Sequence, residues 1–294
     1  MAAPVVTSRP NVPAVTFKAL VLSVLLMICL TALLSGCRVH NEAAASVATV
    51  STSSQTYSSK FPLTENPISE GRQWQVGSGA GVSLLLGENL LHQGRLWGDV
   101  QTISGFAYGV DEPTTFGDPT AILTGTWGPT QTVSATVKIN KTPTQGCCHE
   151  VELRLRTSIS SKSITGYEAY CSVAPNQRYC HIARWNGPNG SYWNFETGSS
   201  SIYLVDGDSI TATATGINPT IITLYRNGAQ ILQATDTGSA GGGFGAYGPW
   251  TSGNPGIGFF DNHDEHWRDF GFSSFEATDR ISNSPAKVRS IDYK

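Results

Sequence analysis

Short runs of alternating apolar and polar residues, separated by glycine, proline and asparagine, dominate the sequence after residue 60. Helical periodicity is nearly absent there, whereas a period of two is typical of strands with one buried face. This pattern predicts an all-β antiparallel sandwich. The Asn-Gly pair in YRNGAQI (225–231) predicts a hairpin with a two-residue turn. The candidate strands are 132–139, 150–157, 166–173, 179–185, 209–215, 221–226, 230–235, 256–260 and 270–277.

The first 36 residues have the layout of an export signal. An uncharged apolar run, 19–34, follows Arg9 and Lys18 and is followed by Ser-Gly and then Cys37. A positive front, an apolar middle and small residues at the cut site indicate a cleaved signal peptide. The segment resembles the lipobox of bacterial lipoproteins. That resemblance implies that Cys37 becomes the first residue and carries acyl chains such as palmitate, which anchor it in the lipid bilayer. A plain signal peptide or an uncleaved anchor is the alternative.

Composition divides the rest of the chain into three parts. Residues 37–59 are rich in Ala, Ser, Thr and Val with few charges, and we interpret them as a flexible tether. Residues 60–279 are long enough for a single all-β domain with a sizeable core. Residues 280–294 form a polar tail. We expect an exported lipoprotein on the periplasmic side or at the cell surface.

Charge and cysteine content agree with export. The net charge of −3 becomes −5 when the two cations of the signal are removed, and no basic patch exists, so we expect no nucleic-acid partner. Four cysteines remain beyond the signal and the lipidation site, which allows two disulfides in three connectivities. Their spacing lacks a Cys-x-x-Cys pair, which disfavours a zinc site. These cysteines are Cys147, Cys148, Cys171 and Cys180.

The segment 166–185 predicts a disulfide. A Pro-Asn pair at its centre suits a two-residue turn, and the resulting register places Cys171 opposite Cys180. This pair falls at a non-hydrogen-bonded site, where Cα atoms approach to about 4.5 Å, a spacing that a disulfide can bridge. Cys147 and Cys148 are left to pair with each other, to pair elsewhere or to stay reduced. The alternative is a slipped register in which Cys148 takes one of the hairpin thiols.

The same register sorts the side chains of this hairpin into two faces. The predicted core face carries Tyr167, Ala169, Cys171, Val173, Cys180 and Ile182. Arg184 shares that parity and therefore has to pair with a carboxylate or lie at an edge. The predicted outward face carries Glu168, Tyr170, Ser172, Tyr179, His181 and Trp185. The strand 150–157, if it is a neighbour, adds Glu150, Glu152, Arg154 and Arg156 to the outward face.

Such an outward face has the chemistry of a sugar-binding surface. Aromatic rings cover the apolar C–H patches of pyranoses, while fixed charged groups bond to hydroxyls. The alternative is the solvated side of a half-buried sheet, with aromatic residues present for their β propensity. The residues predicted to bind a ligand are Glu152, Arg154, Glu168, Tyr170, Tyr179, His181 and Trp185.

Several stretches resemble exported domains of the concanavalin A-like lectin and glucanase superfamily (LamG-like). They are FGDPTAILTGTWGPTQTVSATVKI (116–139), LVDGDSITATATGINPTIITLYRNGAQI (204–231), TSGNPGIGFF (251–260) and DFGFSSFEATD (269–279). The resemblance implies a jelly-roll sandwich of two antiparallel sheets, one of them concave, with a first strand ending near Trp74. Because this fold hosts lectins, glycosidases, lyases and adhesive modules, it does not identify an activity.

A catalytic site is only weakly indicated, and we assign no catalytic residue. The glucanases of the superfamily carry Glu-x-Asp-x-Glu, whereas HEVELRLR has Arg154 where the third acid would stand. A polysaccharide lyase would instead use Tyr170 or Tyr179 with His181. We therefore expect a membrane-anchored, lectin-like domain that binds polysaccharide on its concave face without catalysis. A glycoside hydrolase, a polysaccharide lyase and a structural or adhesion module remain alternatives.

A metal site is also weakly indicated. The stretch FFDNHDEHWRDF (259–270) offers Asp261, Asp264 and Glu265 as oxygen ligands for Ca²⁺. The spacing lacks the Asp-x-Asp-x-Asp-Gly pattern, so an ordinary polar loop between two strands is favoured. We predict no other cofactor.

Overall fold

The described part of the chain is built from β-strands. The computed structural model describes residues 54–76, 98–110, 118–144, 148–160, 163–187, 192–197, 201–238, 248–261 and 267–280. The predicted signal peptide and most of the predicted tether and tail lie outside these ranges. No helix among the described residues is long and apolar enough to cross a membrane.

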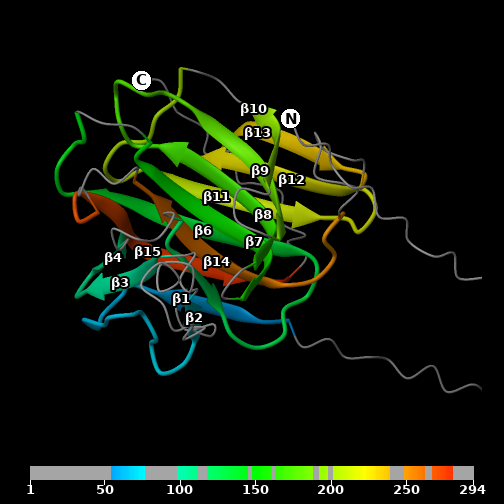
Figure 1. Cartoon of the computed structure of the whole chain (residues 1–294), viewed down its shortest axis with the longest axis horizontal. Helices are drawn as coiled ribbons and strands as arrows, with labels where there is room; N and C mark the ends of the chain where they lie inside the picture. Colours follow the sequence, from blue (N-terminus) through cyan, green and yellow to red (C-terminus); the bar gives the residue numbers. More distant parts are fainter. Residues whose placement is uncertain are drawn as a thin grey trace, which may run out of the picture. The chain divides into compact units, whose positions relative to one another are not determined.

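Two antiparallel sheets form the fold (Figure 1). Sheet A has eight strands. In spatial order they are β13 (Ala229–Asp236), β12 (Thr220–Arg226), β11 (Ser209–Thr215), β6 (Gln131–Ile139), β15 (Phe270–Thr278), β4 (Phe106–Val110) and β3 (Asp99–Ile103), with β1 (Thr56–Ser59) also paired to β15. Strands from opposite ends of the domain are therefore neighbours, since β1 pairs with β15.

Sheet B has seven strands. In spatial order they are β10 (Tyr192–Thr197), β9 (Cys180–Gly187), β8 (Ser163–Ser172), β7 (Glu150–Ser160), β14 (Asn254–Phe260), β5 (Thr120–Leu123) and β2 (Trp74–Val76). The late strand β14 lies between β7 and β5, so that sheet B also joins distant parts of the sequence. This interleaving of two antiparallel sheets is a jelly-roll sandwich, the predicted fold class.

The core lies between the two sheets. Alternate side chains of β6 (Val133, Ala135, Val137) and of β7 (Val151, Leu153, Leu155) belong to one cluster of buried apolar residues. Burial of a Val or Leu side chain contributes roughly 1.5–3 kcal/mol, so each Val and Leu of these two strands stabilises the packing of the sheets. The period-two alternation in the sequence is the local cause of this arrangement.

The strands predicted from alternation are all present, with small shifts at their ends. The Asn-Gly turn is confirmed: Asn227 and Gly228 both have positive φ (51° and 81°), and Arg226 pairs with Ala229. Six strands, β1 to β5 and β10, were missing from the predicted set. The strand that the resemblance placed near Trp74 is β2, which begins at Trp74 and ends at Val76, and it is preceded by β1 within the last residues of the predicted tether.

The predicted disulfide is confirmed. Cys171 pairs with Cys180 in the β8–β9 register, their Cα atoms are 4.0 Å apart and the sulfurs are bonded. The turn closes through a hydrogen bond from Gln177 N to Ala174 O (3.0 Å). The slipped register is therefore wrong. Cys148 is disulfide-bonded as well, and Cys147 lies outside the described residues.

Candidate functional site

The candidate site lies on the face of sheet B that points away from the core. Strands β7, β8 and β9 are neighbours, with Glu152 opposite Tyr170 and Tyr170 opposite His181. Because alternate residues point to opposite faces, polar and aromatic side chains from three strands gather on one side. The predicted core face of the hairpin is buried as expected. We call the opposite side the outer face of sheet B.

The outer face is much less exposed than the sequence suggested. Glu152 and Arg154 are 0% exposed, and Glu168, Tyr170 and Trp185 are also buried. Tyr179 and His181 are partly exposed, as is Glu150. The five buried side chains point away from the core, as parity predicted, but they are not exposed to solvent. Charges in such a place are stable only when they are paired, which leads to the contacts of Arg154.

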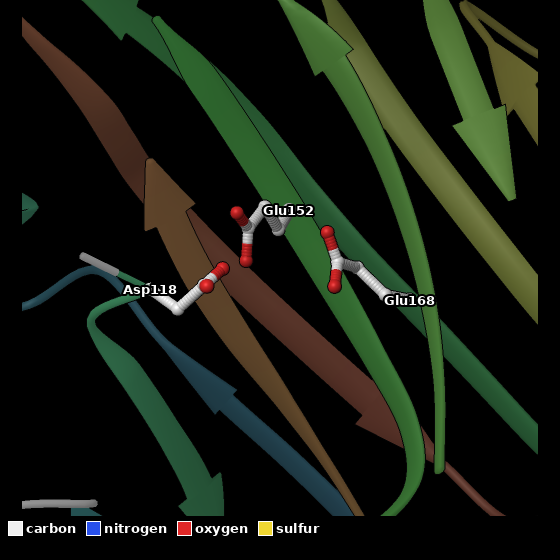
Figure 2. A group of neighbouring side chains, drawn as sticks. All are labelled: Asp118, Glu152 and Glu168. Atoms are coloured by element: carbon white, nitrogen blue, oxygen red, sulfur yellow. The ribbon is translucent and has the colours of Figure 1, made fainter. Parts of the chain in front are cut away.

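Arg154 is the centre of a buried ion-pair network. Its Nη1 lies 2.6 Å from Glu168 Oε2, and its Nη2 contacts Glu152 Oε2. Nη2 is also 3.6 Å from Oδ1 of Asp118, which precedes β5. Figure 2 shows the three carboxylates converging, and their oxygens lie within 4.8 Å of one another. Such a trio has a spacing suited to a metal ion, but here the guanidinium contacts all three.

Trp185 contacts two members of this network. Its indole Nε1 donates a hydrogen bond to Glu168, and the guanidinium carbon of Arg154 lies 5.5 Å from the centre of the indole ring. A cation over an aromatic face is attracted by the ring quadrupole. The indole of Trp185 thus orients Glu168 and Arg154, and only 4% of the residue is exposed.

The carboxylates of the outer face outnumber its cations. Burial raises the pKa of Glu150 well above its usual range, and the charges of Glu168 and Asp118 add to the shift. Burial also raises the pKa of Glu152, although Arg154 opposes the shift. For Arg154, burial lowers the pKa, but the surrounding carboxylates outweigh it and raise the pKa overall. The guanidinium therefore stays charged, and Glu150 and Glu152 tend to retain protons.

Three rings lie beside the network, and we call Tyr170, Tyr179 and His181 the ring cluster. The imidazole centre is 5.2 Å from each tyrosine ring centre, and the two tyrosine rings are 6.3 Å apart. The Tyr179 hydroxyl donates a hydrogen bond to Glu150. Burial lowers the pKa of His181, so that its imidazole is neutral near pH 7.

Several buried polar atoms of this face lack a hydrogen-bond partner among the described residues. They are Oε1 of Glu152, Nε of Arg154 and Nδ1 of His181. A buried polar group without a partner costs roughly 1–3 kcal/mol, so native proteins keep few of them. A polar ligand that reached these three atoms would gain hydrogen bonds.

Gly258 makes room for the network. It pairs with Glu152 across β7 and β14. A Cβ atom at this position would collide with Oε2 of Glu152 and would lie 2.8 Å from Nε of Arg154. Sequence reasoning missed both Gly258 and Asp118. An isolated glycine within a strand, which often marks close approach of another group, was the available signal for the first.

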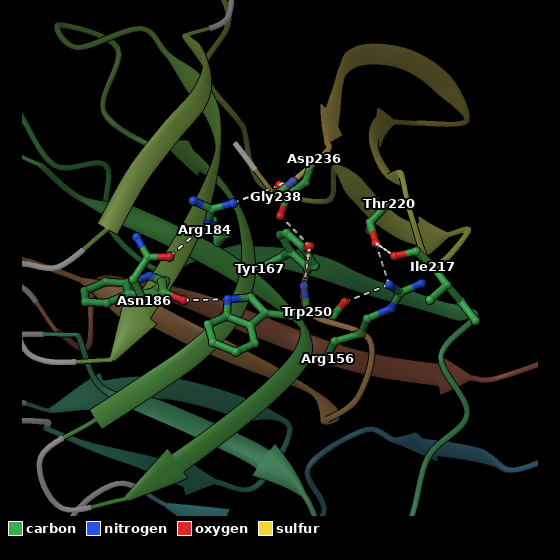
Figure 3. Close-up of polar contacts among 10 residues, drawn as sticks. Arg156, Tyr167, Arg184, Asn186, Ile217, Thr220, Asp236, Gly238 and Trp250 are labelled. Carbon is green, nitrogen blue, oxygen red and sulfur yellow. Dashed lines mark hydrogen bonds and ion pairs between the residues drawn. The ribbon is translucent and has the colours of Figure 1, made fainter. Parts of the chain in front are cut away.

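A second polar network joins the two sheets on the core side (Figure 3). Arg184 was expected to need a carboxylate, and its Nη1 lies 2.8 Å from Asp236 Oδ1. The Tyr167 hydroxyl donates to Asp236 (2.7 Å) and accepts a hydrogen bond from Trp250 N (2.8 Å). Trp250 Nε1 in turn donates to the carbonyl of Trp185 (2.9 Å). The core-side network thereby supports the indole that orients Glu168.

Arg156 belongs to this second network and not to the outer face, which corrects the prediction from parity. A bulge interrupts the β7–β8 register after Leu155, and Arg156 has a φ of 48°. Its guanidinium donates to Thr220 Oγ1 and Trp250 O, each at 2.8 Å. A bulge re-aims a side chain, which strict alternation cannot anticipate.

The proposed Ca²⁺ ligands stay a prediction. Asp264 and Glu265 lie outside the described residues. Asp261 is buried, and its Oδ1 is 3.6 Å from Nε2 of the buried His149. A carboxylate that faces an imidazole in this way has a local partner already.

The strand order and register define the class of this protein as a jelly-roll sandwich domain. No family model matches the chain, and no curated protein sequence matches it significantly. Solved structures resemble it only loosely. A carbohydrate-binding module, CBM66 from Bacillus subtilis, is 11% identical over 74% of this chain and 98% of its own, with a TM-score of 0.42.

Two further solved structures are similar at the same level. The CBM2 module of the evolved Dit protein of Lactobacillus casei BL23 phage J-1 is 14% identical over 76% of this chain and 95% of its own, with a TM-score of 0.43. The β-agarase A in complex with oligoagarose is 10% identical over 78% of this chain and 94% of its own, with a TM-score of 0.41. All three TM-scores are below 0.5, so function has to be argued from the residues.

Proposed function

We propose that this chain is a membrane-anchored, extracytoplasmic lectin-like domain that binds carbohydrate on the outer face of sheet B. The observation that carries the proposal is the ring cluster, whose Tyr179 and His181 are partly exposed beside Glu150. Aromatic faces pack against the C–H patches of a pyranose, and a carboxylate accepts hydrogen bonds from its hydroxyls.

The unpartnered polar atoms support the same assignment. Nδ1 of His181 and Oε1 of Glu152 are two buried atoms that lack a hydrogen-bond partner within the described residues. A sugar hydroxyl both donates and accepts hydrogen bonds, so a bound glycan would supply a partner to either atom. The rigid β-strands beneath hold these atoms in place before the ligand arrives, which limits the entropy lost on binding.

Hydrolysis is a second candidate, favoured by one observation. Oxygen atoms of Glu152 and Glu168 lie within 4.8 Å of each other, and burial raises the pKa of Glu152. A retaining glycosidase uses two carboxyls about 5–5.5 Å apart, one of them with a raised pKa. However, Arg154 contacts both carboxylates, which favours binding over catalysis.

A glycan panel tests the proposal. The full chain would be incubated with neutral, amino and uronate polysaccharides, with binding followed by calorimetry. Products would be followed by reducing ends and by the absorbance of unsaturated sugars. We expect binding without products. New reducing ends would identify the protein as a hydrolase, and unsaturated sugars would identify it as a lyase. Either result would contradict the lectin function. Failure to bind any member of the panel would overturn the carbohydrate function and favour an adhesive module.

Export, which the proposed membrane anchor requires, is supported by a disulfide. The Cys171–Cys180 disulfide is typical of proteins outside the reducing cytosol. Export then agrees with the signal-like segment that ends before Cys37. Labelling of cells with a palmitate analogue tests the anchor. The label should be present on the wild-type chain and absent from Cys37→Ser, and a variant that keeps the label would contradict acylation at this residue.

A further inference from the structure

We infer that the outer face of sheet B selects glycans that carry free amino groups over glycans that carry carboxylates. This inference rests on the proposed function and assigns the substrate class of the same site. The candidate ligand is a hexosamine unit whose protonated amine lies next to Glu150 while its ring packs against Tyr179. Uronate polysaccharides are the class that the site should reject.

The charge balance of the described residues is the first argument. Asp118, Glu152 and Glu168 all contact the guanidinium of Arg154. Glu150 adds a fourth carboxylate, and its hydrogen-bond partner is the uncharged Tyr179 hydroxyl. With all four carboxylates ionised, these residues and the guanidinium would carry a formal charge of −3. Burial raises the pKa of Glu150, and the charges of Glu168 and Asp118 add to the shift, so that the site tends to hold a proton that an ammonium group would replace.

Two neighbouring cationic side chains within the described ranges do not cancel this surplus of negative charge. Burial lowers the pKa of His181, which leaves the imidazole uncharged near pH 7. Arg178 precedes Tyr179 in the chain, but its guanidinium lies over the ring of Tyr203 (5.0 Å) and its Nε donates to the carbonyl of Pro175. Arg178 is also exposed, where solvent and salt screen its charge.

Because the carboxylates are buried, their surplus negative charge acts more strongly on a charged ligand than it would in water. Glu152 is 0% exposed, and its Oε1 lacks a hydrogen-bond partner among the described residues. Charges in a low-dielectric surrounding interact several times more strongly than charges in water. An ammonium group at the partly exposed edge of this face therefore favours the ionised form of the deep carboxylates and is attracted by it, whereas a uronate is repelled by that form. The ring cluster adds the apolar surface that distinguishes a sugar from a free cation.

The test compares two oligosaccharides with the same backbone. Chitosan pentaose carries free amines, and chitin pentaose carries the same units N-acetylated; a galacturonate pentaose represents the acidic class. Binding to the full chain would be measured by calorimetry near pH 6, where the amines are protonated. We expect chitosan pentaose to bind about tenfold more tightly than chitin pentaose, as one charge-assisted hydrogen bond would give. Galacturonate pentaose should bind weakest.

Two matched variants locate the charge effect. Glu150→Gln keeps the shape and the hydrogen bond from Tyr179, and it should reduce the preference for chitosan pentaose to about twofold or less, since the ion pair is lost. Glu276→Gln changes an exposed carboxylate of sheet A and should leave the preference unchanged. If both variants weaken chitosan binding equally, the attraction is a general effect of net charge and the inference is wrong.

The remaining outcomes separate the inference from the function on which it rests. Equal or tighter binding of chitin or galacturonate pentaose overturns the amine preference and leaves carbohydrate binding intact. Failure of all three to bind, together with a failed glycan panel, overturns both. If Glu150→Gln does not fold, as judged by circular dichroism, Asp118→Asn removes another of the four charges. It should lower the chitosan preference about threefold, and an unchanged preference would contradict the inference.

Discussion

Nη1 of Arg154 lies 2.6 Å from Oε2 of Glu168 across the β7–β8 pair, and both side chains are buried. The same guanidinium contacts Glu152 and lies 3.6 Å from Asp118. A single cation therefore holds together three carboxylates from three different segments of the chain. The site and the stability of sheet B both depend on this relationship.

Removal of the guanidinium should destabilise the domain strongly. Arg154→Met keeps the volume but leaves the three carboxylates without their counter-ion, and breaking a buried ion pair in this way costs about 3–5 kcal/mol. Urea denaturation at pH 7 measures the loss. Arg178→Met, at an exposed position, is the control and should change the unfolding free energy by less than about 0.5 kcal/mol. A similar small change in Arg154→Met would show that the network is not holding the fold together.

Stability should fall as the pH rises from about 4.3, the usual pKa of a glutamate, through the raised pKa of Glu152. The folded state binds more protons than the unfolded state in this window, so the free energy of unfolding decreases with pH. Glu152→Gln removes this contribution and should flatten the profile. Urea unfolding from pH 5 to 8 gives the difference in unfolding free energy between the wild type and the variant at each pH. The opposite contribution of His181 is present in both proteins and therefore cancels in this difference. Parallel profiles would contradict the raised pKa.

Gly258 should be intolerant of a side chain. In Gly258→Ala the new Cβ would collide with Oε2 of Glu152, and the ion pairs with Arg154 prevent that group from moving aside. Overpacking of this kind costs about 1–3 kcal/mol. Gly128→Ala is the control, because its Cβ would approach Asp279 no closer than 3.3 Å. Thermal unfolding of both variants checks the expectation, and equal midpoints would be inconsistent with the close approach described.

The disulfide should contribute measurably to stability. Cys171 and Cys180 are nine residues apart, and closing a loop of this size restricts the unfolded chain by about 2–3 kcal/mol. The double variant Cys171→Ala/Cys180→Ala should be less stable by this amount in urea. Reductant applied to the double variant measures the separate contribution of the Cys148 disulfide. A double variant as stable as the wild type would mean that the bond adds nothing to the fold.

Alternation along the chain predicted the two faces of the β8–β9 hairpin because the period of a strand is fixed at two. The turn residues set the register, so the pairing of Cys171 with Cys180 followed without knowledge of the rest of the fold. The need of Arg184 for a carboxylate could also be predicted, since its parity placed a charge in the core. Its partner, Asp236, comes from the other sheet and was not identifiable in advance.

The alternation of apolar and polar residues could not predict that the outer face of sheet B is buried. Alternation indicates which way Glu152 and Arg154 point but not what surrounds them. Asp118 reaches Arg154 because β5 and β7 both pair with β14, and those pairings join segments far apart in the sequence. The bulge at Arg156 is a further limit, because it breaks the parity on which the prediction relied.

The most direct test of the proposed carbohydrate site is the affinity of ring-cluster variants for the oligosaccharide of the panel that binds tightest. Tyr179→Ala and His181→Ala should each weaken binding about tenfold, or 1.4 kcal/mol, because each removes a partly exposed ring. Tyr225→Ala, which removes a partly exposed tyrosine from sheet A, should leave the affinity unchanged. Affinity that survives loss of both rings, or that falls equally in Tyr225→Ala, would contradict a glycan site on the outer face of sheet B.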